Sequence, residues 1–72
     1  MIPIGQKVRV SKRCDNAELH DAIGIVASSP DGVVDRSSEG ILWIEFEKLI
    51  ASKEGGAPFD AAEVDADVLE LL

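Results

Sequence analysis

Apolar and polar residues alternate along three short segments of the chain, at residues 7–11, 23–28 and 41–46. In the first of these, Val8 and Val10 fall on one side and polar residues fall on the other. Successive side chains of a β-strand point to opposite faces, so a period of two predicts a strand with one buried face. The three segments therefore predict a β-sheet with a dry side and a wet side.

The segment at residues 41–46 carries the strongest pattern. Leu42, Ile44 and Phe46 share one face, and Trp43 lies beside Glu45 on the other. The three apolar residues are expected in the core. The tryptophan is then expected on the opposite side of the sheet.

A helix over residues 39–53 is the alternative for this region. It would align four apolar side chains along one stripe. These are Leu42, Phe46, Leu49 and Ile50. The β-branched and aromatic residues of the segment fit a pleated surface better, so the strand is preferred and the helix stays as the alternative.

The segments between the strands contain turn and loop residues. Residues 12–21 are polar and predict a long loop, with Leu19 folded back as its apolar anchor. Gly24 interrupts the second strand and predicts a bulge or a close backbone approach. Residues 29–32, Ser-Pro-Asp-Gly, predict a turn, and residues 33–34 are expected to add a short strand segment.

The C-terminal region predicts a helical turn and a closing element. Asp60 and Glu63 are spaced like a capping box, which predicts a helical turn near residues 60–64. Residues 68–72 are expected to form either a short closing strand or the end of that helix. The fold class that follows is mainly β: a small barrel of about five strands in one domain, residues 1–72.

Composition and charge limit the function. The chain is 46% hydrophobic and has a formal net charge of -7, so it is not a disordered chain and it repels nucleic acid unless its cations cluster. Four cations do occur in residues 1–13, whereas residues 54–72 contain six acidic residues and no basic one. The four are Lys7, Arg9, Lys12 and Arg13. No Tyr or Phe lies among them to stack on bases, so RNA binding is only the alternative function.

The single cysteine, Cys14, forms no disulfide within the chain, which favours a reducing cytoplasm. There is no apolar run of about 18 residues and no signal-peptide pattern. We therefore expect no membrane association and a mature chain that begins at Met1.

The order of these segments resembles that of SH3-like barrels. The resemblance rests on residues 5–10, 23–26, 44–46 and 59–64, which are spread over most of the length of the chain. Within that group the chain is most similar to small accessory barrels: photosystem I reaction-centre subunit IV, the variable chain of ferredoxin-thioredoxin reductase, and the nitrile hydratase β-subunit family with its relatives among nitrogen-fixation accessory proteins. The resemblance implies a non-catalytic docking role beside a larger enzyme, and it transfers no binding residue. Residues 49–58 are long for the corresponding loop.

Two groups of residues suggest chemistry and then fall short of it. Cys14 and His20 share a loop, but a zinc site would need carboxylates for its other ligands, and a nucleophile would need further partners. Asp31, Asp35 and Glu39 invite calcium, but their spacing is not that of a calcium loop. We expect no metal, no cofactor and no catalysis.

Trp43 is the residue least explained by packing. Exposed tryptophans are common at binding hot spots, although residues 49–58 folded over Trp43 would make it part of a second small core. We predict a cytoplasmic protein-interaction or accessory module, with an RNA- or ribosome-associated module using Lys12 and Arg13 as the alternative, and the oligomeric state open. The predicted contact residues are Trp43, Glu45, Glu47, Lys7 and Arg9.

Overall fold

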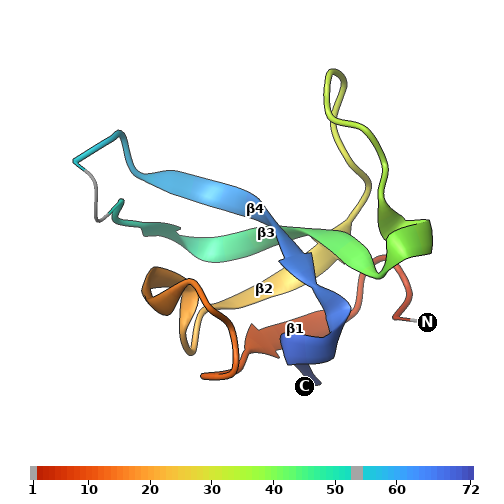
Figure 1. Ribbon diagram of the computed structural model, residues 1–72, viewed down its shortest axis with the longest axis horizontal. Coiled ribbons are helices and arrows are strands. Elements are labelled where there is room, and N and C mark those ends of the chain that lie inside the picture. The colour runs from red at the N-terminus through yellow and green to blue at the C-terminus, as the bar shows by residue number, and fades with distance from the viewer. Residues whose placement is uncertain (1, 53–54) are drawn as a thin grey trace.

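The computed structural model describes residues 2–52 and 55–72, and these residues form one antiparallel sheet of five strands (Figure 1). The strands are β1 (Lys7–Val10), β2 (Ile23–Ala27), β3 (Ile41–Ile50), β4 (Phe59–Asp65) and β5 (Leu69–Leu71). Their order in the sheet is β4-β3-β2-β1-β5, so the last two strands of the sequence lie at opposite edges. The expected mainly β class with about five strands is confirmed, and the alternative helix over residues 39–53 is wrong.

Alternation explains why the sheet has a core side. Leu42, Ile44 and Phe46 of β3 are buried, with Ile44 fully enclosed. Ile44 pairs with Val26 of β2 on one side and with Ala62 of β4 on the other. Burying such an aliphatic side chain stabilises the fold by about 1.5–3 kcal/mol.

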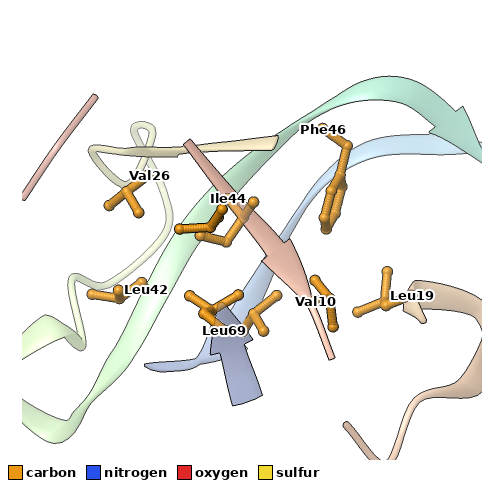
Figure 2. Close-up of a cluster of buried hydrophobic side chains, with 9 residues drawn as sticks. Val10, Leu19, Val26, Leu42, Ile44, Phe46 and Leu69 are labelled. Carbon is orange, nitrogen blue, oxygen red and sulfur yellow. The ribbon is translucent and has the colours of Figure 1, made fainter. Parts of the chain in front are cut away.

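Figure 2 shows that the core side chains of all five described strands converge in one cluster. Leu19, which belongs to the short 3-10 helix η1 (Ala17–Leu19), is 3% exposed and completes it. Its expected role as the apolar anchor of the loop is confirmed. The full cluster is Val8, Val10, Leu19, Val26, Leu42, Ile44, Phe46, Val64 and Leu69.

Gly24 marks a close approach between two strands. It lies opposite Phe46 of β3 and Val8 of β1, and it is buried. A Cβ at this position would lie 2.9 Å from Cγ2 of Ile44 and would press on the backbone oxygen of Glu45. Of the two expectations for Gly24, the close approach is the one observed.

The loop between β2 and β3 differs from the expectation in two details: the turn lies one residue later, at residues 30–33, and no strand segment follows it. The amide of Val33 donates to the Pro30 oxygen at 3.1 Å, so Asp31 and Gly32 are the central residues of the turn, and Gly32 adopts φ +88°. The short strand expected at residues 33–34 is wrong. Val34 is 78% exposed, and none of the five described strands pairs with it.

The helical turn expected near residues 60–64 is also wrong, because that stretch is β4. Ala62 and Val64 alternate toward the core and pair with β3, which outweighs the local capping signal. The helical turn follows as η3 (Ala66–Val68), where the Asp65 carboxylate accepts a hydrogen bond from the Asp67 amide at 3.1 Å. The closing strand is confirmed as β5.

The β3–β4 hairpin extends beyond the core at one end of the molecule (Figure 1). Its register shifts between Glu45 and Ile50, and Leu49 is 66% exposed. The N-terminal segment, the β2–β3 loop and the short 3-10 helix η2 (Ser37–Glu39) lie at the opposite end (Figure 1). Within residues 2–52 and 55–72, no helix has the length and hydropathy needed to cross a bilayer.

Candidate functional site

The outer face of the sheet, which points away from the core, contains all five predicted contact residues. Trp43 lies between Ala27 of β2 and Glu63 of β4 in the strand register. Glu45, two residues further along β3, lies opposite Ile25 of β2. The remaining three predicted residues alternate onto the same face, and two of them, Lys7 and Glu47, form an ion pair across the strands. The third is Arg9.

Trp43 lines a groove at the end of the sheet where β2 stops and β3 begins. The groove has a volume of about 310 Å³ and is bounded by residues 2–4, by the strand ends around Ala27 and Leu42, and by Ser28, Ser29, Asp35 and Ser37 of the β2–β3 connection. We call it the Trp43 groove. Its lining is mainly apolar, and Asp35 is the charged residue in it.

The N-terminal segment forms one wall of the Trp43 groove because backbone hydrogen bonds hold it against β2. The Gly5 amide donates to the Val26 oxygen at 2.8 Å, and the Val26 amide donates to the Gln6 oxygen at 3.0 Å. Ile2 packs against the core, whereas Ile4 is 68% exposed at the groove. The groove therefore joins segments that are distant in sequence.

Trp43 is half-buried. The expected alternative, in which residues 49–58 fold over Trp43, is not observed among the described residues. Leu49 and Ile50 line a different cavity of about 280 Å³, together with Ile23 and Phe46. The described residues of 49–58 do not line the Trp43 groove, and residues 53–54 of that segment lie outside the described residues. Trp43 is accordingly half-buried and contributes to the lining of the groove.

Asp35 is held in place by its own turn. Its Oδ1 accepts a hydrogen bond from the Ser37 amide at 2.9 Å. This backbone hydrogen bond, with a further one from the Ser37 hydroxyl, lowers the pKa of the Asp35 carboxyl, so the group is ionised at neutral pH. The adjacent Arg36 points instead to Glu39, with Nε 3.6 Å from Oε2.

The basic residues of the outer face are engaged with acidic ones. Lys7 Nζ lies 3.4 Å from Glu47 Oε1, and Arg9 Nε lies 3.0 Å from Glu70 Oε1. These pairs are half-exposed and stabilise the fold by about 0–1 kcal/mol each. Arg13 donates to the Asp67 backbone oxygen at 2.6 Å.

The acidic residues next to Trp43 are different. Glu45 and Glu63 are both exposed, and neither forms an ion pair with any residue in the described part of the chain. The outer face therefore has Trp43 near the end of β2, acidic side chains beside it on β3 and β4, and paired charges toward β1.

In the long loop, the histidine side chain forms a hydrogen bond with the backbone of the cysteine. His20 Nε2 donates to the Cys14 backbone oxygen at 2.7 Å, and Cys14 is half-buried against the core. Among residues 2–52 and 55–72, no three His, Cys, Asp or Glu side chains gather as a metal ion would require.

Together, these features define a small mainly β protein with an apolar, tryptophan-lined groove at one end of an antiparallel sheet. Comparison of the chain with protein-family models, with curated proteins and with solved structures gives no match.

Proposed function

We propose that this protein is a non-catalytic, cytoplasmic interaction module that docks onto a larger enzyme or complex through the Trp43 groove. The observation that carries this proposal is the position of Trp43, which faces away from the core and lines an apolar groove. A role of this kind agrees with the resemblance to SH3-like accessory barrels.

Tryptophan suits a docking role because one rigid side chain buries a large area, about 150–250 Å². Trp43 is already half-buried against its neighbours, so binding would cost it little side-chain entropy. Ile4 adds an exposed aliphatic side chain on the other wall. A partner that fills the groove would cover both.

A protein partner is favoured over RNA because two basic residues of the outer face already form ion pairs within the chain. Lys7 and Arg9 are paired with carboxylates, which leaves less positive charge for phosphate contacts. The net charge of -7 acts in the same direction.

The experiment is affinity capture from nuclease-treated lysate of the source cells, using the wild-type chain, Trp43→Ala and Ile4→Ser. We expect a stoichiometric partner that survives nuclease and whose affinity falls about 30-fold or more on Trp43→Ala, as at a hot spot. Leu49→Ser is the matched control, because Leu49 is 66% exposed and Ile4 is 68% exposed, but Leu49 lies outside the groove.

Circular dichroism establishes that each variant is folded. Ile4→Ser removes an exposed side chain that is not part of the buried core, so it tests the groove even if Trp43→Ala is destabilised. A partner retained by Trp43→Ala and Ile4→Ser alike, or lost on nuclease treatment, would overturn the proposal.

A further inference from the structure

The Trp43 groove contains an unusual combination: one ionised carboxylate set among apolar side chains and serine hydroxyls. The carboxylate belongs to Asp35, and the apolar walls come from Ile4, Ala27 and Trp43. Asp35 is exposed in the free chain, so a ligand that covers it must displace its water, which costs free energy unless the ligand supplies a cation.

The Asp35 carboxylate has no cation of its own. It accepts hydrogen bonds from the amide and the hydroxyl of Ser37, and Arg36, the nearest cation in sequence, is directed to Glu39. Over residues 2–52 and 55–72, no ion pair involves Asp35. A carboxylate has about four acceptor sites, so capacity remains for a donor from outside the chain.

From this geometry we infer that the Trp43 groove binds a segment of a partner protein in which an apolar side chain stands next to a lysine or arginine. The apolar side chain lies against Trp43 and Ile4. The cation pairs with Asp35. This inference rests on the proposed docking function and specifies the chemistry of the partner.

The surroundings of the groove favour the same kind of partner. Glu45 and Glu63 flank Trp43 on the outer face without ion pairs among the described residues, so the field around the groove is negative. Complementary charge raises the association rate and discriminates against acidic segments.

A second copy of this chain suits the groove poorly. Each copy has a net charge of -7, and three of its seven cations, Lys7, Arg9 and Arg36, are already paired within the chain. Two copies would repel one another, whereas a basic segment would be attracted.

The test is a selection of random 12-residue peptides displayed on phage against the immobilised wild-type chain, after depletion on Trp43→Ala. We expect the selected peptides to contain Lys or Arg next to an apolar residue. Because the chain has one tryptophan, synthetic copies of the peptides can be titrated by its fluorescence, and binding should shift the emission to the blue. Light scattering of the wild-type chain alone identifies self-association.

The role of Asp35 is tested with Asp35→Asn, which keeps the oxygen that accepts from Ser37. We expect this variant to bind the peptides about tenfold more weakly, as for loss of a charged hydrogen bond. Asp31→Asn, an exposed residue of the same loop that does not line the groove, is the matched control and should bind normally. Replacing the peptide cation by alanine should cost wild type about tenfold, but should cost Asp35→Asn little.

The outcomes separate the two proposals. Peptides that require Trp43 but carry no cation, or that bind Asp35→Asn as well as wild type, would overturn the inference and leave the docking function intact. A selection with no Trp43-dependent peptide would also overturn it, and the lysate capture with Trp43→Ala then decides the docking function independently. A wild-type dimer that is lost on Trp43→Ala would show that the occupant is a second copy.

Discussion

Two glycines of this chain are required for different physical reasons, and alanine substitution distinguishes them. Gly40 has φ +79° and open space where a Cβ would lie, so alanine there lowers the stability only through the strain of the left-handed backbone. Gly24 has an ordinary φ but faces Ile44 and the Glu45 backbone, so alanine there must push two strands apart.

We expect Gly40→Ala to lower the free energy of unfolding by about 1 kcal/mol, the cost of a left-handed alanine. Gly24→Ala should cost more, about 2–3 kcal/mol, because the clash lies in the packed sheet. Urea denaturation followed by circular dichroism measures both. A cost for Gly24→Ala no larger than that for Gly40→Ala would mean that the strands separate easily at this point.

At the residue scale, the sequence predicted part of the candidate site. The alternation around Trp43 placed it on the outer face, and this placement is confirmed by the strand register. The place of Asp35 in the lining of the Trp43 groove could not be predicted from alternation. The groove forms only when folding brings together residues 2–4, the end of β2 and the β2–β3 connection. The one local signal is that Ser37 follows Asp35 by two residues, a spacing that favours a side-chain turn.

The strands were predicted where packing and local preference agree. In β3 the β-branched and aromatic residues support the same structure as the alternation, and the strand extends further than predicted, to Ile50. In β4 the two signals conflict: Asp60 and Glu63 suggest a helical start, but Ala62 and Val64 pair with β3. Long-range pairing prevailed, and a local pattern contains no information on that pairing.

Strand position in the sheet predicts which elements open first. β3 is hydrogen-bonded to β2 and β4 on its two sides, whereas β5 has three residues and pairs only with β1 within the described sheet. We expect the paired amides of β5 to exchange with solvent at least about tenfold faster than those around Ile44, because edge strands open locally.

Hydrogen exchange followed by NMR on the wild-type chain measures this difference. The short strand β1, which is also central, serves as the comparison for length. Equal protection in β5 and β3 would mean that the sheet opens only as one cooperative unit.

At the scale of the whole molecule, charge is unevenly compensated. The net charge is -7, and the described ion pairs use Lys7, Arg9 and Arg36. The molecule extends over 32 × 27 × 20 Å, so at about 0.01 M salt, where the Debye length is about 30 Å, all its carboxylates repel one another.

We therefore expect salt to stabilise the fold. Raising sodium chloride from about 0.01 M to about 0.5 M should increase Tm by a few degrees, because screened repulsion outweighs the weakening of exposed ion pairs. Scanning calorimetry measures the shift, and Glu63→Gln, which removes one unpaired carboxylate, should depend less on salt. A Tm that falls with salt would show that the cross-strand pairs dominate.

The extended β3–β4 hairpin has a practical consequence. Its exposed residues 55–58 are small or proline, and they lie at the end of the molecule away from the N-terminal wall of the Trp43 groove (Figure 1). Loop tips of this composition accept insertions with little loss of fold. A biotin acceptor tag placed there would tether the protein to a sensor chip by this end, with the N-terminal wall of the Trp43 groove at the end away from the chip.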